Sequence, residues 1–549
     1  IDADCSAKTL VSYFYRSNQP PASFKPFDPA APRPADLERT TTSTGQTVDY
    51  IVRREKGTIN RAIYEIAFLH VPGQPIPDPW TAAQGWNGRL VYSFGGGCRA
   101  GYRQAASGSS LNDGALAGGY AVALSSLNVF GNNCDDTISA ETMMMVKEHF
   151  IKTFGVPVHT IGWGGSGGSM QQHLIAQNYP GLLDGITPSS SYPDITSVIA
   201  GTVDCSLLDR AFNGSSVAWT EDQKTAVSGF ATWRTCATGW MRNYSPSWVK
   251  ADACEAAIAK PQVYNAASNP GGTRCGIYDN QANLYGRDPS TGFARRPLDN
   301  VGVQYGLAAL RAGKIDAEQF VQLNERAGGY DADGNLAASR TAADPAALRS
   351  AYEKGRVNSG GGSLGSIPVI DWRNYMDNKG DIHDRFRSFS TRARLAAANG
   401  RADNQVILTL IPSTKVDVLS QMNKWLDNIA KDTSGDNALA KVVRNKPAEL
   451  TDACWTADGE KIAEPQTFDG KGRCNELYPN HSNPRIVAGA PLADNILKCA
   501  LKAVDANDYP AALTSGQLTR LKQVFPQGVC DYSRPGVGQQ QVRGSWFVY

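Results

Sequence analysis

The chain has 549 residues, more than one ordinary hydrophobic core holds, which predicts two or more domains or one domain with a large insertion. Hydrophobic residues make up 41% and charged residues 19%, as in a globular protein with a fairly polar surface. The formal net charge is only +2 and no run approaches 18 apolar residues, so we expect no nucleic-acid partner, no anionic membrane surface and no membrane span.

The amino-terminal residues and the cysteines predict a secreted or periplasmic protein. The chain begins Ile1-Asp2-Ala3, as expected of a mature protein whose signal peptide has been removed. Its 11 cysteines are spread singly, without a Cys-x-x-Cys pair, which favours disulfides over metal sites. The odd number leaves at least one cysteine free or paired outside the chain. We expect no metal or cofactor, and the preferred disulfides are Cys98 with Cys134 and Cys454 with Cys474.

The first 190 residues alternate between predicted strands and helices. A proline-rich run at 19–34 should lie extended over the surface. Strands are predicted at 48–54 and 62–71, as a hairpin at the sheet edge, and then at 90–94 and 120–124, followed by a helix at 139–154. This alternation predicts an α/β fold with a mostly parallel sheet covered by helices on both faces.

The segment 158–170 carries the strongest chemical signal. It reads as a strand, a Gly-x-Ser-x-Gly turn centred on Ser166, and a helix from Ser169 to about Tyr179. A serine on so sharp a turn is strained, and Gly164 and Gly168 let the neighbouring chain pass closely. We therefore predict that Ser166 is a nucleophile, with a further strand at 182–188.

A glycine run follows the strand at 90–94. Acyl transfer places negative charge on a carbonyl oxygen, and that charge needs two aligned N–H donors. The amide of Gly167 is one candidate donor, and those of Gly96 and Gly97 are the others. The alternative interpretation of this run is a flexible loop.

The alternation stops at Asp194. The stretch 194–363 is irregular, has predicted helices at 301–312 and 317–327, and ends in Ser-Gly-Gly-Gly-Ser, a flexible-linker composition. We expect it to form a lid or insertion domain. Its tryptophans should line an apolar substrate pocket, or else form the small core of the insertion itself. They are Trp219, Trp233, Trp240 and Trp248.

The sheet resumes after the insertion. Strands are predicted at 367–372 and 405–411, with helices ending near 399 and spanning 416–431. Residues 1–193 and 364–549 are thus expected to form one sheet-bearing domain, with an amino-terminal extension and a cysteine-bearing carboxyl-terminal tail.

Two histidines can serve as the general base for Ser166. In chain order the base should follow the nucleophile, which leaves His383 and His481, because His173 should point away from Ser166. The loop 412–415, the usual place for this base, contains no histidine. His383 is favoured, in the first turn of a helix capped by Asp381 and Asp384, and His481 is the alternative.

The orienting acid has two candidates after the strand at 367–372. Asp377 is favoured, because it lies ten residues into the segment that begins at Pro368, and Asp371 is the alternative.

Taken together, these motifs resemble the α/β-hydrolase superfamily. The segment Tyr179-Pro180-Gly181 before a strand is similar to the tannase and feruloyl-esterase group, and the tail is similar to that of secreted bacterial proteins of undefined function. In place of the tannase cysteine beside the nucleophile stands Gly165, so the disulfide between nucleophile and base loops is not available.

The resemblance implies a serine hydrolase that cleaves carboxylic esters, of small or polymeric substrates, through an acyl-enzyme. Two alternatives are an amide or peptide hydrolase with the same machinery and a non-catalytic binding module that has lost its base. The missing histidine after Ile411 favours the last. The sequence makes no prediction of oligomeric state.

Overall fold

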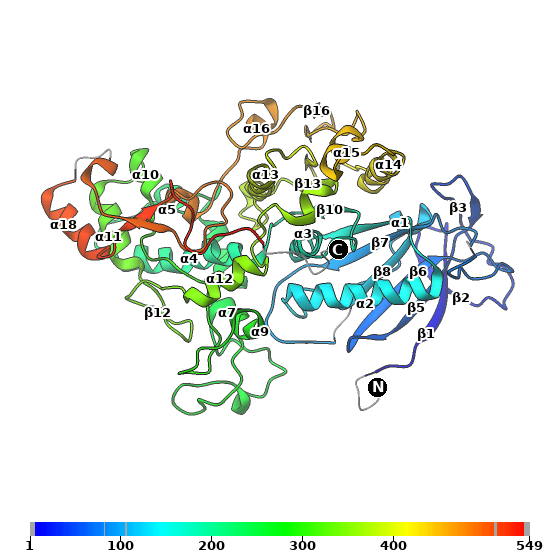
Figure 1. Ribbon diagram of the computed structural model, residues 1–549, viewed down its shortest axis with the longest axis horizontal. Coiled ribbons are helices and arrows are strands. Elements are labelled where there is room, and N and C mark those ends of the chain that lie inside the picture. Colours follow the sequence, from blue (N-terminus) through cyan, green and yellow to red (C-terminus); the bar gives the residue numbers. More distant parts are fainter. Residues whose placement is uncertain (1–5, 82, 105–106, 510–512, 543–549) are drawn as a thin grey trace.

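A computed structural model describes residues 6–81, 83–104, 107–509 and 513–542 (Figure 1). In this part of the chain, twelve strands form one sheet. From edge to edge they are β16 (Lys461–Ala463), β15 (Ala453–Trp455), β14 (Gln405–Leu410), β13 (Val369–Asn374), β10 (Gly185–Ser189), β9 (His159–Gly165), β7 (Arg89–Gly95), β8 (Ala121–Val129), β6 (Ala62–Leu69), β5 (Ile51–Ile59), β1 (Leu10–Arg16) and β2 (Phe24–Phe27).

The central strands run parallel from β15 to β8, with β7 placed between β8 and β9. β6 pairs antiparallel with β8, and β5, β1 and β2 continue antiparallel beyond it. β8 follows β7 in the chain but lies on the side of β7 away from β9, and β6 runs antiparallel to the central strands. This strand order is that of the α/β-hydrolase fold. The predicted fold class is confirmed.

Helices cover both faces of the sheet, as predicted. Val91 packs with the helices of one face, whereas its neighbours Leu90 and Tyr92 pack with those of the other, because successive strand residues point to opposite sides. The first face is covered by α1 (Asp113–Ala117), α14 (Val418–Ala430) and α15 (Ala438–Arg444). The second is covered by α2 (Asp136–Phe154), α3 (Gly167–Asn178), η3 (Gly362–Ser366) and α13 (Phe386–Asn399).

The predicted hairpin of β5 and β6 forms, but it does not lie at the sheet edge. β1 pairs with the outer side of β5, and β2 then pairs with β1. The sequence of β1, Leu-Val-Ser-Tyr-Phe-Tyr-Arg, is rich in the aromatic residues that favour strands. These two strands therefore cover an edge that the hairpin would expose. A separate small sheet joins β3 (Arg39–Thr41) and β4 (Thr47–Asp49).

The insertion between β10 and β13 is mainly helical. The predicted helix at 317–327 is found, but that at 301–312 is limited to 307–311, because Gly302 and Gly306 take left-handed backbone angles, with φ of 82° and 79°. The elements are α4 (Ile195–Asn213), α5 (Glu221–Ser228), η1 (Thr235–Trp240), α6 (Met241–Asn243), α7 (Ser245–Val249), η2 (Lys260–Gln262), α8 (Ile277–Asn280), α9 (Ala282–Tyr285), α10 (Leu307–Arg311), α11 (Ala317–Ala327), β11 (Gly329–Tyr330), β12 (Leu336–Ala337) and α12 (Pro345–Glu353).

The later part of the carboxyl-terminal tail packs on this insertion, whereas its first strands, β15 and β16, extend the sheet as the sequence suggested. Leu521 and Phe525 of the tail share a hydrophobic cluster with Phe320 of α11, and the last helix lies beside α11 (Figure 1). The domain boundaries themselves stay a prediction. The tail contains α16 (Arg473–Leu477), α17 (Pro484–Val487), β17 (Ala500–Lys502), η5 (Ala506–Asp508), α18 (Ser515–Val524) and β18 (Val529–Asp531).

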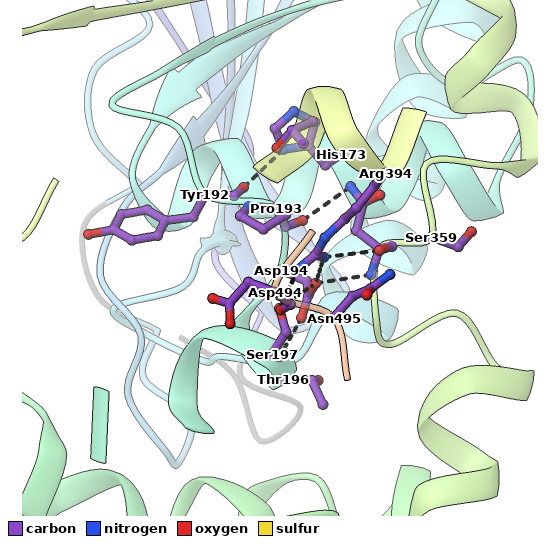
Figure 2. Close-up of polar contacts among 12 residues, drawn as sticks. His173, Tyr192, Pro193, Asp194, Thr196, Ser197, Ser359, Arg394, Asp494 and Asn495 are labelled. Atoms are coloured by element: carbon purple, nitrogen blue, oxygen red, sulfur yellow. Dashed lines mark hydrogen bonds and ion pairs between the residues drawn. The ribbon is translucent and has the colours of Figure 1, made fainter. Parts of the chain in front are cut away.

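A buried ion pair joins the two ends of the insertion to the sheet-bearing part (Figure 2). Asp194, which caps α4, accepts a 2.6 Å hydrogen bond from Arg394 of α13, and both side chains are fully buried. Arg394 also donates to the carbonyl of Asn358, where the insertion ends, and to that of Ala493 in the tail. One guanidinium therefore connects four segments.

The prediction that residues 359–363 form a flexible linker is wrong. Gly360 packs so tightly against α13 that an added Cβ would lie 2.3 Å from the backbone of Arg394. The amide of Ser359 donates to Gln177 of α3 at 2.7 Å. Glycine is needed here for close backbone approach, not for flexibility.

Five disulfides form among the described cysteines. Both predicted pairs are confirmed, and the complete set is Cys98–Cys134, Cys205–Cys236, Cys254–Cys275, Cys454–Cys474 and Cys499–Cys530. Cys5, the eleventh, and the chain start lie outside the described residues. Such a set is typical of proteins that fold in an oxidising compartment. Among the described helices, none combines the length and apolarity that crossing a bilayer requires.

Candidate active site

Ser166 occupies the sharp turn between β9 and α3. Its φ of 57° and ψ of −123° lie in a region that non-glycine residues rarely adopt. A Cβ added to Gly164 or Gly168 would lie 2.3 or 2.5 Å from the carbonyl oxygen of Phe94. The crowding predicted for this turn is therefore present, and α3 begins directly after Ser166, two residues earlier than expected. Strain of this kind, held by the surrounding structure, is a mark of functional sites.

The glycine run after β7 lies against this turn. A Cβ added to Gly96 would lie 3.4 Å from the Cβ of Ser166, and one added to Gly167 would lie 2.1 Å from the carbonyl oxygen of Gly97. Gly131 anchors the run by donating to the Gly96 carbonyl at 2.9 Å. Within the described part of the chain, the amides of Gly96, Gly97 and Gly167 have no hydrogen-bond acceptor. Three N–H groups in the two segments that meet at Ser166 thus lack an acceptor in the described structure.

His383 lies in the loop between β13 and α13. Its Nδ1 is 2.6 Å from a carboxylate oxygen of Asp381, which also accepts the His383 amide at 2.8 Å. The imidazole is 28% exposed, and its Nε2 has no partner among the described residues. Burial alone would raise the pKa of Asp381, but the hydrogen bond from His383 holds that pKa below its ordinary value. An ionised carboxylate thus orients a ring whose other nitrogen is free.

The predicted helix start at His383 is wrong. α13 begins at Phe386, without a side-chain cap, and Asp381 closes a turn on His383 instead. Asp384, the other expected capping residue, is fully buried, and neither of its carboxylate oxygens has a hydrogen-bond partner in the described part of the chain.

Tyr192 connects the Ser166 turn to the His383 loop. Its backbone amide donates to the Ser169 hydroxyl at 2.9 Å, and that hydroxyl donates to the Ser166 carbonyl at 2.6 Å. Its phenol hydrogen-bonds the carbonyl of Ile382, and its ring centre lies 5.7 Å from that of His383. His173, predicted to point away from Ser166, contacts the Tyr192 carbonyl through Nδ1 at 2.9 Å (Figure 2).

Neither predicted acid contacts a candidate base in the described residues. The carboxylate of Asp377 accepts the Arg385 amide at 3.0 and 3.1 Å, and burial raises its pKa to about 6. Asp371, within β13, accepts from the Ser388 hydroxyl at 3.0 Å. Asp381, which the sequence placed in a helix cap, is the carboxylate that meets His383.

His481 lies in the carboxyl-terminal tail, where its chain neighbours make two hydrogen bonds. The carbonyl of Pro479 accepts from the Tyr375 hydroxyl at 3.0 Å, and the amide of Ser482 donates to the carbonyl of Gly229 at 2.8 Å. Burial lowers the pKa of the His481 imidazole. Among the described residues, no carboxylate hydrogen-bonds to it.

A family of proteins matches nearly the whole chain. The model of the "Tannase-like family of unknown function (DUF6351)" matches residues 1–541. The chain belongs to this family. No curated protein matches its sequence.

Solved structures with low sequence identity are also similar to it. Feruloyl esterase B from Aspergillus oryzae is 15% identical, with 78% of this chain and 88% of that chain covered and a TM-score of 0.38. Tannin acyl hydrolase from Aspergillus niger is 12% identical, with 78% and 89% covered and a TM-score of 0.33.

In this member of the tannase-like family, Gly165 stands where the tannase group was expected to have a cysteine. A Cβ at this position would lie 2.5 Å from the Ser189 hydroxyl. It would also lie 3.1 Å from the Ser189 carbonyl oxygen, so a cysteine here would need the Ser189 side chain to rotate and its backbone to shift slightly.

The four tryptophans of the insertion are divided between two places. Trp219 and Trp233 pack around Phe212 in the insertion core, with ring centres 4.7 and 5.2 Å from it. Trp240 packs 6.2 Å from the ring of Tyr192, and Trp248 donates to the carbonyl of Cys98 at 3.0 Å. Only the second pair touches residues next to the candidate site, and the substrate-binding role of all four stays a prediction.

Proposed function

We propose that this protein is a secreted serine hydrolase that cleaves carboxylic ester bonds through an acyl-enzyme. The observation that carries the proposal is the strained Ser166, beside a glycine run and a helix start whose three amides lack an acceptor in the described structure. Membership of a tannase-like family supports an ester substrate. The five disulfides support secretion into an oxidising compartment.

In the first half of the proposed reaction, the Ser166 hydroxyl attacks the ester carbonyl carbon. His383 Nε2 removes the hydroxyl proton, and Asp381 stabilises the resulting imidazolium through Nδ1. The amide of Gly167, with that of Gly96 or Gly97, donates to the developing oxyanion. The imidazolium then protonates the leaving alcohol as the C–O bond breaks.

In the second half, water replaces the alcohol. His383 removes a proton from the water, which attacks the acyl-enzyme, and the proton returns to Ser166 as the acid product leaves. Every catalytic group in this proposed sequence belongs to the chain, so the reaction as written needs no cofactor. His481 is the alternative base, and Asp377 and Asp371, the two acids predicted from the sequence, are the alternative acids.

The insertion would form one wall of the substrate site. η1 packs closely on the His383 loop. A Cβ added to Gly239 of η1 would lie only 2.8 Å from Ile382 Cγ2. Trp240 at the end of η1 is buried against Tyr192 and so fixes this wall in place. We propose bulky or polymeric esters as substrates, because a wall supplied by the insertion gives their large groups an extended surface to contact.

A fluorophosphonate probe tests the proposal, because it reacts only with an activated serine. We expect stoichiometric labelling of the wild type and none of Ser166→Ala, with Ser420→Ala, an exposed serine of α14, as the matched control. Ser166→Ala should also abolish hydrolysis of aryl esters. A protein that is not labelled, or a variant that keeps its turnover, would contradict the proposal, and faster cleavage of matched anilides would favour the amide-hydrolase alternative.

A further inference from the structure

A cavity lies beside the glycine run that faces Ser166. It has a volume of about 450 Å³. One wall is formed by residues 99–103, which directly follow Gly97 and Cys98, and the other by residues 253–258 of the insertion with Trp248. The disulfides Cys98–Cys134 and Cys254–Cys275 hold the two walls in place.

The cavity lies near the segment that faces the candidate nucleophile. A Cβ added to Gly96 would lie 3.4 Å from the Cβ of Ser166, and the Gly96 carbonyl accepts from the Gly131 amide at 2.9 Å. The carbonyl of Gly131 in turn accepts from the guanidinium of Arg103 at 2.8 Å. Arg99 is two residues from Gly97, so their Cα atoms are at most about 7.6 Å apart. The wall of the cavity thus begins two residues after the glycine run that faces Ser166.

The cavity has more positive than negative groups on its walls. Arg99 and Arg103 share a single carboxylate, that of Glu255, at 3.2 and 3.3 Å. Their side chains are 59% and 41% exposed, so both guanidinium groups remain accessible to a ligand. The planar guanidinium matches a carboxylate through two parallel hydrogen bonds. Trp248, Ala256 and Ile258 give the same cavity apolar walls.

We propose that this cavity binds a carboxylate on the remote part of the ester substrate, so that the preferred substrates are esters of acidic compounds. This inference rests on the proposed ester hydrolase. Arg99 and Arg103 would hold the carboxylate, and the apolar walls would hold the ring or chain that joins it to the scissile ester. The two arginines thus determine specificity and take no part in the chemical step.

Two matched esters test the inference, an aryl acetate with a ring carboxylate and the same compound with a neutral carboxamide in its place. The wild type should show a higher kcat/KM for the acid. Arg99→Gln should lower the ratio of the two kcat/KM values about fivefold, the effect of losing one exposed ion pair. Glu255→Gln, which removes the competing carboxylate, should raise the ratio. Arg401→Gln, in an exposed ion pair with Asp403, is the matched control and should leave it unchanged.

The outcomes separate this inference from the proposed function. A ratio that is the same in the wild type, Arg99→Gln and Glu255→Gln, with both esters hydrolysed, overturns the acidic subsite and leaves the ester hydrolase standing. A protein that hydrolyses neither ester contradicts both. Raising the salt concentration provides a second readout, because screening of the guanidinium groups should reduce the preference for the acid.

Discussion

At the scale of single residues, His383 and His481 differ in their surroundings. His383 has an ionised carboxylate on one nitrogen and a free second nitrogen, whereas no carboxylate holds the His481 ring among the described residues. We expect His383→Ala to lower kcat by about 10³-fold or more, because the members of a catalytic triad act as a unit. His481→Ala should have a small effect. Steady-state kinetics with an aryl ester measures both.

Steady-state kinetics also distinguishes Asp381 from Asp377 as the acid that orients the base. Asp381→Asn should lower kcat by at least about tenfold, because the amide no longer stabilises the imidazolium. Asp377→Asn leaves the His383 contact intact and should lower kcat less. Loss of activity in Asp377→Asn and His481→Ala, with Asp381→Asn and His383→Ala active, would instead support the tail histidine as the base.

Asp384 gives a pH-dependent prediction. Burial, together with repulsion from Asp377, raises its pKa well above the ordinary value. The folded protein therefore binds this proton more tightly than the unfolded chain, so the free energy of unfolding falls as pH rises from about 4 towards the raised pKa. Asp384→Asn cannot ionise. The Tm of this variant, relative to that of the wild type, should rise as the pH increases from about 4 to 8. Calorimetry at several pH values measures both Tm values. A difference between the two Tm values that does not change with pH would contradict the prediction.

At the scale of elements, the pattern of the sequence agreed best with the structure where a few neighbouring residues determine the backbone. The strand, turn and helix around Ser166 and the helix at 317–327 are examples. The expected helix start at His383 failed, although Asp381 and Asp384 have suitable spacing for a cap. Asp384 is instead buried below the loop, and Arg373 donates to its carbonyl oxygen at 2.6 Å.

The junction between α4 and α13 gives a prediction at this scale. Asp194→Asn removes the charge that balances the fully buried Arg394. Leaving a buried guanidinium without its carboxylate costs about 3–5 kcal/mol, so the variant should unfold at a clearly lower temperature. Asp403→Asn, which breaks the exposed pair with Arg401, is the matched control and should cost at most about 1 kcal/mol. Equal thermal shifts in the two variants would show that the junction does not hold the insertion in place.

At the scale of the whole molecule, the insertion and the tail are interdependent. Residues from α4, α10, α11 and α18 share one hydrophobic cluster, although the sheet-forming segment 369–410 separates them along the chain. Two ion pairs from Arg520 to Glu318 and Glu325 support the same packing. The helical cluster of the insertion is thus built from two distant stretches of sequence.

The amino-acid sequence was enough to predict the fold class, the strained turn at Ser166, the glycine run beside it and two of the disulfides. These features depend on local backbone geometry, on hydrophobic periodicity and on strand order, all of which are visible in short stretches of residues. Other features became visible only in the folded chain: Asp381 meets His383, Tyr192 connects this loop to the Ser166 turn, and the glycines at 360–362 are packed. Such partners come from segments far apart in the chain, and their choice depends on how whole elements pack together.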